Sequence, residues 1–380
     1  MILIKRAKVY APQYLGVKDV LVGADRIEAV ENQIDCNLPC CEVIDAEGKC
    51  LVPGMIDPHV HVTGGGGEGS FHTQVPPVSF QELIGGGVTT VVGLLGTDGI
   101  TRSVENLLAK VKALREEGLT AYACTGSYGY PSVTLTGDVK KDLVFLDEVI
   151  GVKLALSDHR APNVTVEELI RLGSDARVAG MLSGKCGMVV LHMGDDERGL
   201  NPVFEALERT AIPKKIFHPT HVTRTESLLK QAFAFANRGG YIDMTCDIGG
   251  KHPTAQRILQ AKKEGVNLEQ ITLSSDGMGS WSKYDESGNL VKIGYSPVDT
   301  VYRTVVSMVR DANLPLEQAL TFATSNTARA LELFPKKGCI CPKADADLLL
   351  LEEDLTLNTV LAMGKVMMRN GKIVVKGTYE

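Results

Sequence analysis

The chain has 380 residues, of which 44% are hydrophobic and 23% charged, and its formal net charge is −6. This length fits two ordinary domains, or one barrel of about 250 residues with an appendage, and the apolar content is enough for a large core. The acidic balance argues against a nucleic-acid surface, which would need a basic patch.

The sequence carries no signal for export or for a membrane. Its first twelve residues, MILIKRAKVYAP, lack the apolar segment and cleavage site of a signal peptide. No apolar run reaches the ~18 residues of a membrane span. The nine cysteines include no C-x-x-C pair, and a zinc knuckle at Cys40-Cys41 or Cys339 to Cys341 is the alternative to scattered reduced thiols. We expect a cytoplasmic protein that binds neither membrane nor nucleic acid.

Both ends of the chain have the pattern of short strands. They are predicted at Ile2–Tyr10, Val17–Val22 and Arg26–Val30, and at Ala346–Leu351, Thr359–Met363, Lys365–Arg369 and Lys372–Lys376. The Asn370-Gly371 dipeptide between apolar runs is a hairpin signal. We expect the two ends to meet in one small β-sandwich domain made of residues 1–52 and 340–380.

The middle of the chain, residues 53–339, alternates apolar runs with helical patterns. The eight runs are Gly54–His61, Val88–Leu95, Ala121–Thr125, Gly151–Leu156, Met188–His192, Lys215–His221, Tyr241–Cys246 and Ile271–Asp276. Helical patterns are found at Val104–Glu117, Val166–Leu172, Pro202–Thr210, Thr225–Arg238 and Pro253–Glu264. Alternation predicts an α/β fold with parallel strands, and eight repeats favour a (β/α)8 TIM-like barrel. The alternative is an open doubly wound sheet, but no G-x-G-x-x-G follows the first strand.

Histidines gather where these strands are expected to end. His59 and His61 close the first run, and His192 and His221 close the fifth and sixth. Side chains two apart on a strand point to the same face, and catalytic groups of such barrels sit at the carboxyl ends of strands. Converging imidazoles are suited to binding a divalent metal. The alternative is that they are hydrogen-bonded histidines of the core, but chance would seldom place four of them at strand ends.

Two further residues fit the same site. Lys153 lies in an apolar strand, where burial lowers the pKa of an amine. A neutral amine can react with carbon dioxide to form a carbamate, which could bridge two metals, although a lysine paired with a carboxylate is the simpler alternative. Asp276 ends the eighth run and could bind metal and carry a proton, although Asp is also common at helix N-termini.

The segment from Val52 to His61 resembles the first-strand signature of the amidohydrolase superfamily, and Lys153, His192, His221 and Asp276 follow in that superfamily's order. The resemblance spans the chain, including the split β domain. It implies a barrel with two Zn²⁺ ions per subunit. His59, His61 and Asp276 would hold one ion and His192 and His221 the other, with a carbamate on Lys153 between them.

Within the superfamily the chain resembles the isoaspartyl (β-aspartyl) dipeptidases. The matching segments are Gly64–Glu68, Thr125–Tyr128, Ser157–Arg160, Thr220–Arg224 and Ser274–Ser280. The resemblance implies that Glu68 binds the substrate ammonium and that Arg160 and Arg224 bind the carboxylate of the leaving residue. Thr97, Ser280 and backbone near Gly66 would hold the aspartyl carboxylate, and Tyr128 would stabilise the oxyanion.

We therefore expect a binuclear-zinc metallo-dipeptidase that splits isoaspartyl dipeptides, with Asp276 and Tyr128 as its catalytic residues. The resemblance also implies a homo-oligomer, an octamer. The alternatives are another amidohydrolase, such as a dihydroorotase or a D-aminoacylase, and a metal-free scaffold. The sequence leaves open whether the metal is zinc, manganese or cobalt, and whether residues 281–296 cover the site.

Overall fold

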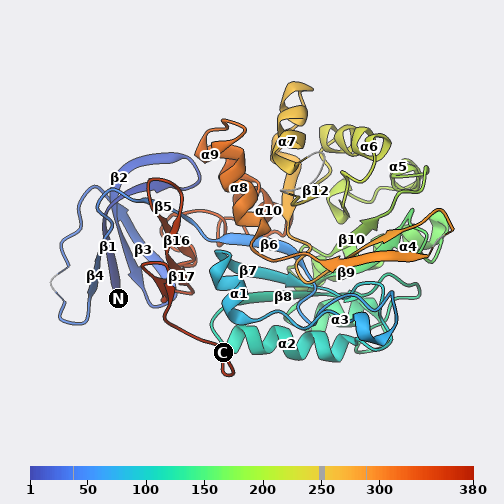
Figure 1. The fold of residues 1–380 in the computed structure, drawn as a ribbon, viewed down its shortest axis with the longest axis horizontal. Coiled ribbons are helices and arrows are strands. Elements are labelled where there is room, and N and C mark those ends of the chain that lie inside the picture. Colours follow the sequence, from blue (N-terminus) through green and yellow to red (C-terminus); the bar gives the residue numbers. More distant parts are fainter. Residues whose placement is uncertain (37, 248–252, 288) are drawn as a thin grey trace.

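The computed structural model describes residues 1–36, 38–247, 253–287 and 289–380. Strands from the two ends of the chain lie side by side, apart from the helices of the middle (Figure 1). These strands are β1 (Ile2–Tyr10), β2 (Tyr14–Gly23), β3 (Arg26–Glu31), β4 (Glu42–Asp45), β5 (Cys50–Pro53), β16 (Leu348–Leu351), β17 (Leu357–Ala362), β18 (Lys365–Arg369) and β19 (Lys372–Ile373).

The terminal strands form one connected sheet in the order β19-β18-β17-β16-β5-β1-β2-β3, with β4 paired to β1. The two ends of the chain join where β5 pairs with β16, with Leu51 opposite Leu350. An apolar core that includes Ile4, Val20 and Leu348 lies against this sheet. The predicted small β domain from both termini is confirmed, and its boundaries at residues 52 and 340 stay a prediction. The four-residue strands β4 and β5 were missed because they are too short to show alternation.

The middle of the chain provides eight strands in a barrel. They are β6 (Met55–Val60), β7 (Val88–Gly93), β8 (Thr120–Gly126), β9 (Val149–Leu156), β10 (Met188–Met193), β11 (Phe217–Thr220), β12 (Ile242–Thr245) and β13 (Ile271–Ser274). Strands β6 to β11 pair in parallel in chain order, and β12 pairs with β13. The last strand returns to the first, where His61 N donates to Gly277 O at 2.8 Å. The predicted barrel is confirmed, and the open sheet was the wrong alternative.

Helices cover the outside of the barrel (Figure 1). They are α1 (Phe80–Gly85), α2 (Val104–Glu116), α3 (Val139–Phe145), α4 (Val166–Ser183), α5 (Asn201–Glu208), α6 (Glu226–Asn237), α7 (Thr254–Lys263), α8 (Thr300–Arg310), α9 (Leu316–Thr321) and α10 (Ser325–Ala330), with single turns at Phe71–Thr73, Lys214–Ile216 and Leu268–Gln270. None of the described helices is long and apolar enough to cross a membrane.

Helix α4 is eleven residues longer than the sequence pattern predicted. Thr165 and Glu168 form a capping box at its start, and Gly184 ends it in the left-handed conformation with φ 67°. The second half buries small residues, Ala176 and Ala179 among them, instead of large apolar ones. Their weak apolar signal hid the rest of the helix from the sequence pattern.

A hairpin follows the last barrel strand. Its strands are β14 (Ser280–Tyr284) and β15 (Leu290–Tyr295), and they pair in antiparallel fashion. Ser280 and Trp281 line the mouth of the barrel together with Asp158, Arg224 and other residues. The hairpin therefore borders the candidate site, although Gly288 in the segment 281–296 lies outside the described residues.

Candidate metal centre

The first pair of predicted ligands lies where β6 ends. His59 and His61 are both buried, with ring centroids 5.6 Å apart. Gly96 leaves room for the second ring, because a Cβ at this position would lie 2.9 Å from Cε1 of His61. The alternation of the strand thus brings both imidazoles to one side, as the H-x-H spacing predicted.

The second pair lies across the barrel, on β10 and directly after β11. The ring centroids of His192 and His221 are 4.5 Å apart, and that of His221 is 5.1 Å from His59. Nδ1 of His221 lies 2.6 Å from Oγ1 of Thr245, which fixes the ring and leaves Nε2 facing inward. His221 also has φ 60°, a rare conformation for a residue with a side chain.

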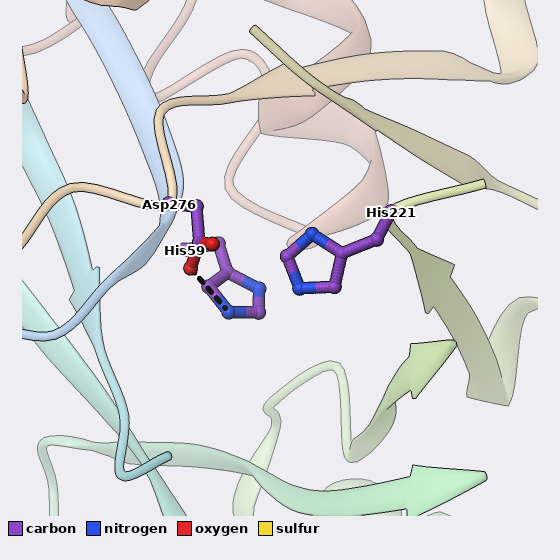
Figure 2. Close-up of side chains that lie close together, drawn as sticks. All are labelled: His59, His221 and Asp276. Atoms are coloured by element: carbon purple, nitrogen blue, oxygen red, sulfur yellow. Dashed lines mark ion pairs between the residues drawn. The ribbon is translucent and has the colours of Figure 1, made fainter. Parts of the chain in front are cut away.

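Asp276 approaches the histidines from the end of β13, and its φ is 52°. Its Oδ1 lies 3.5 Å from Nε2 of His59 and 3.2 Å from Nε2 of His61. Figure 2 shows His59, His221 and Asp276 pointing toward one another, and their ligand atoms lie within 4.8 Å of one another. This is the one group of three or more possible His, Cys, Asp or Glu ligands found among the described residues, so no described cysteines form the alternative zinc knuckle.

The chemistry of these atoms fits a cation. Nε2 of His221 and Oδ1 of Asp276 are buried and have no hydrogen-bond partner, which is costly unless a ligand satisfies them. Burial first, and nearby positive charges second, lower the pKa of His59 far below its usual range, and burial likewise lowers the pKa of His221. Neutral imidazoles keep the lone pairs that bind metals such as zinc.

Lys153 lies at the base of the same cluster. Its side chain is fully buried in β9, and Nζ is 3.0 Å from Nε2 of His59. Burial lowers the pKa of the amine to about 7. Lys337 is also buried, but its surroundings differ. Its Nζ lies 2.9 Å from Asp345 and also pairs with Asp347, and these two carboxylates raise the pKa of the amine despite its burial. No ion pair between the described residues includes Lys153, so the simple explanation of a paired lysine does not apply to it.

Tyr128 lies beside the second histidine pair. Its hydroxyl is 2.6 Å from Nδ1 of His192, and burial raises the pKa of the phenol well above its usual value. A protonated phenol in this position is a hydrogen-bond donor aimed at the centre of the site. This placement is compatible with the predicted role at a developing oxyanion.

The predicted ammonium-binding residue already has partners. The carboxylate of Glu68 accepts hydrogen bonds from Ser280 Oγ at 2.8 and 2.9 Å and from Thr97 Oγ1 at 3.4 Å. Arg160 Nη1 lies 3.5 Å from the same carboxylate. Thr97 and Ser280, which the resemblance assigned to a substrate carboxylate, therefore hold Glu68 in this structure.

Arg160 and Arg224 meet on a residue that the sequence reasoning did not assign. Asp158 accepts from Nε and Nη2 of Arg160 at 2.9 and 3.0 Å, and from Nη1 of Arg224 at 3.1 Å. Its carboxylate is buried, and hydrogen bonds from His192 and Arg160 hold its pKa far below the usual range despite that burial. An Asp-x-Arg sequence just past the lysine strand was the available signal.

Ten predicted residues line one hollow. They are His61, Gly66, Glu68, Thr97, Tyr128, Arg160, His192, Arg224, Asp276 and Ser280. Gly66 has φ 81° there, and a Cβ would lie 2.5 Å from Thr73 O, so the position requires glycine. His59, Lys153 and His221 complete the set through the contacts described above. All thirteen predicted residues therefore belong to one site, although their roles remain predictions.

Asp57, which lies in the same first-strand signature, has a structural role: it connects two segments of the barrel. Its carboxylate accepts from Ser275 Oγ at 2.5 Å and from the backbone N–H groups of Ser275 and His59, both at 3.2 Å. Burial raises its pKa to about 7. These bonds tie the first strand to the loop after the eighth, and so they position His59 against Asp276.

Residues 50–374 match the Amidohydrolase family. The chain belongs to this family. The resemblance recognised in the sequence is confirmed.

Several solved structures are similar to this chain. The β-aspartyl dipeptidase of Fervidobacterium islandicum AW-1, crystallised in complex with β-Asp-Leu, is 43% identical, with a TM-score of 0.93 and coverage of 98% of each chain. A second structure of the enzyme from that organism is 42% identical with a TM-score of 0.90. A D-hydantoinase structure at 20% identity and TM-score 0.69 shares the fold.

The curated proteins that are similar to this chain carry a different name. A dihydroorotase of Listeria monocytogenes is 26% identical over 250 residues, which cover 62% of this chain and 56% of that protein. A dihydroorotase of Elusimicrobium minutum is 23% identical over 92% of this chain and 88% of its own. The chain thus spans little more than half the length of the first of these relatives.

Proposed function

We propose that this amidohydrolase is a metal-dependent dipeptidase that cleaves the β-aspartyl bond of isoaspartyl dipeptides, giving aspartate and a free amino acid. One observation carries the proposal. A carboxylate, Glu68, and two guanidinium groups, Arg160 and Arg224, line the same hollow as Tyr128 and Asp276. The 43% identity to an enzyme crystallised with β-Asp-Leu supports the same substrate.

The proposed cofactors are two Zn²⁺ ions, held by His59, His61 and Asp276 on one side and by His192 and His221 on the other. A carbamate on Lys153 would complete the set, formed from carbon dioxide and the neutral amine. When bound, the ions would lower the pKa of the attacking water and polarise the scissile carbonyl. The orphaned ligand atoms and the unpaired amine support this assignment.

Three charged groups would select the substrate. An isoaspartyl dipeptide carries one ammonium and two carboxylates. Glu68 would pair with the ammonium, and Arg160 and Arg224 would bind the carboxylate of the leaving residue, since guanidinium matches carboxylate geometry. Because the whole chain has a net charge of −6, an anionic substrate must be attracted locally by these arginines.

Two groups would act on the reacting atoms. Asp276 takes a proton from the attacking water and delivers it to the leaving amine, which must be protonated to depart. Tyr128 donates a hydrogen bond to the oxygen of the former carbonyl, where negative charge develops in the transition state. The raised pKa of this phenol keeps the donor proton in place at neutral pH.

The competing function is a dihydroorotase, favoured by the curated relatives at 23–28% identity. Dihydroorotate has no free ammonium, so Glu68 would have no partner in it. The test is turnover of β-Asp-Leu and of dihydroorotate by one zinc-loaded preparation. Hydrolysis of the dipeptide alone supports the proposal, whereas ring opening of dihydroorotate alone contradicts it.

Assembly and location are further proposals. From its resemblance to the isoaspartyl dipeptidases, we expect a homo-oligomer, an octamer, and we expect it in the cytoplasm. Sedimentation of the purified protein measures the first, and cell fractionation the second.

A further inference from the structure

Asp158 is the one carboxylate among the described residues that contacts both arginines of the site and a predicted metal ligand. Its Oδ2 lies 3.0 Å from Nη2 of Arg160, 3.1 Å from Nη1 of Arg224 and 3.2 Å from Nε2 of His192. We propose that Asp158 is a positioning residue that couples recognition of the leaving carboxylate to the orientation of His192. This inference rests on the proposed dipeptidase function.

The backbone fixes this carboxylate rigidly. Asp158 follows Ser157, which has φ 52°, and its Oδ1 accepts from the backbone N–H of Arg160 at 2.8 Å. Ser157 Oγ donates to Gly199 O at 2.8 Å. Gly194 packs so closely that a Cβ there would lie 2.3 Å from Cα of Asp158. The carboxylate therefore has little freedom to follow its partners, and the partners must adjust to it.

The first consequence concerns His192. An ionised carboxylate can only accept hydrogen bonds, and it lies 3.2 Å from Nε2 of His192, nearer than Nη2 of Arg160 at 3.4 Å. We therefore assign a proton to Nε2, facing Asp158. Nδ1 is then the nitrogen with the lone pair, and it lies 2.6 Å from the Tyr128 hydroxyl at the centre of the site. A carboxylate on the outer nitrogen of a ligating histidine fixes both the ring and its tautomer. Asp158 thus selects Nδ1 as the atom offered to a metal.

The second consequence concerns charge. Arg160 and Arg224 would repel each other if nothing lay between them, and one carboxylate neutralises one of the two positive charges. Glu68 also lies 3.5 Å from Nη1 of Arg160, but the substrate ammonium would balance its charge. The one remaining positive charge then matches the single carboxylate of the leaving residue. The arginines can thus be held side by side before the substrate arrives, which lowers the cost of ordering them on binding.

A matched control exists in the same structure. Asp196 contacts Arg198 through the same pattern, with Oδ1 2.8 Å from the backbone N–H and 3.1 Å from Nε, and Oδ2 3.1 Å from Nη2. This pair is exposed, and its other described side-chain bond goes to Asn163. Asp196→Asn therefore removes the same local charge without touching the site.

The experiment compares wild type, Asp158→Asn, Asp158→Glu and Asp196→Asn, each zinc-loaded and checked for folding by circular dichroism. Steady-state kinetics give kcat and KM for β-Asp-Leu and for β-Asp-leucinamide, which lacks the leaving carboxylate. The rate of zinc loss to a chelator is measured separately. The two deciding quantities are KM and this rate. We expect Asp158→Asn to raise KM for β-Asp-Leu about 10- to 100-fold, and for the amide by a smaller factor. Zinc loss should be about 10-fold faster or more. Asp158→Glu should recover part of both effects, and Asp196→Asn should match wild type.

Equal losses on both substrates, or a change in only one of the two quantities, would overturn the coupling. If Asp158→Asn does not fold, Asp158→Glu decides, because it keeps the charge and displaces it. Asp158→Glu must then raise KM for β-Asp-Leu more than for β-Asp-leucinamide, and it must speed zinc loss. If this variant has the KM and the zinc-loss rate of wild type, the inference is overturned. An inert wild type contradicts the proposed function instead, and the zinc-loss comparison still decides whether Asp158 positions His192.

Discussion

Nζ of Lys153 lies 3.0 Å from Nε2 of His59 on a fully buried side chain, and burial lowers the pKa of this amine from 10.5 to about 7. Two basic nitrogens this close cannot both be charged at low cost. The amine is therefore available as a nucleophile at neutral pH, and this availability leads to the first prediction.

Carbamate formation in the metal-free protein should follow deprotonation of Lys153. At fixed dissolved carbon dioxide, the amount of carbamate should rise with pH through a midpoint of about 7, because the neutral amine reacts and the ammonium does not. Carbon-13 NMR with labelled carbon dioxide measures it directly, with Lys153→Met as the blank. A midpoint near 10 would show that the lysine is solvated and would contradict its assigned role.

The two buried lysines should have opposite effects on stability. In the metal-free protein the lowered pKa of Lys153 means that its ammonium form opposes folding below pH 7, and this penalty declines as pH rises toward 10.5. Lys153→Met should therefore unfold at higher urea than wild type at pH 6, with a smaller gain at pH 9.

Lys337→Met is the matched comparison. It leaves Asp345 and Asp347 buried without their cation, so it should lose about 3–5 kcal/mol of unfolding free energy at pH 6. Urea denaturation of both variants under the same conditions makes the comparison. Equal destabilisation by the two substitutions would contradict the distinction between an unpaired and a paired lysine.

Tyr128→Phe should lower kcat on β-Asp-Leu about 100- to 1,000-fold with little change in KM, because the lost hydrogen bond forms mainly in the transition state. Tyr10→Phe in the terminal sheet serves as a control for removing a tyrosine hydroxyl far from the site. A loss that fell on KM alone would assign Tyr128 to ground-state binding.

Glu68→Gln should abolish recognition of the substrate ammonium. Wild type should prefer β-Asp-Leu over N-succinyl-leucine, which lacks the ammonium, and the variant should lose most of that preference. The measurement is the ratio of kcat/KM for the two substrates, with Glu286→Gln on the exposed hairpin as the control. An unchanged ratio would show that Glu68 serves only to hold Thr97 and Ser280.

The barrel was predictable because its strands are short apolar runs at regular spacing, and each of the eight expected runs overlaps a strand. The candidate ligands were predictable for the same reason: once a strand is placed, His59, His192 and Asp276 follow at or near its carboxyl end. The resemblance added the substrate-side residues, which periodicity could not reveal.

Asp158 was not assigned from sequence, because the Asp-x-Arg signal points to one arginine at most and does not show the other partners, Arg224 and His192, that different parts of the chain bring to it. The positive φ angles of His221 and Asp276 were equally hidden, since neither residue type requires them. The sequence also does not show that Lys337, which directly follows Lys336, is as buried as Lys153. Only the surrounding carboxylates, which are tertiary contacts, distinguish them.

The central claim is that this site hydrolyses the β-aspartyl linkage, and the most direct test offers β-Asp-Leu beside α-Asp-Leu to protein supplied with zinc and bicarbonate. Rapid release of leucine from the β isomer alone is the predicted result, because only that linkage brings the scissile carbonyl to Tyr128 while Glu68 and both arginines are engaged. Cleavage of neither isomer by protein that retains its zinc would contradict the substrate assignment.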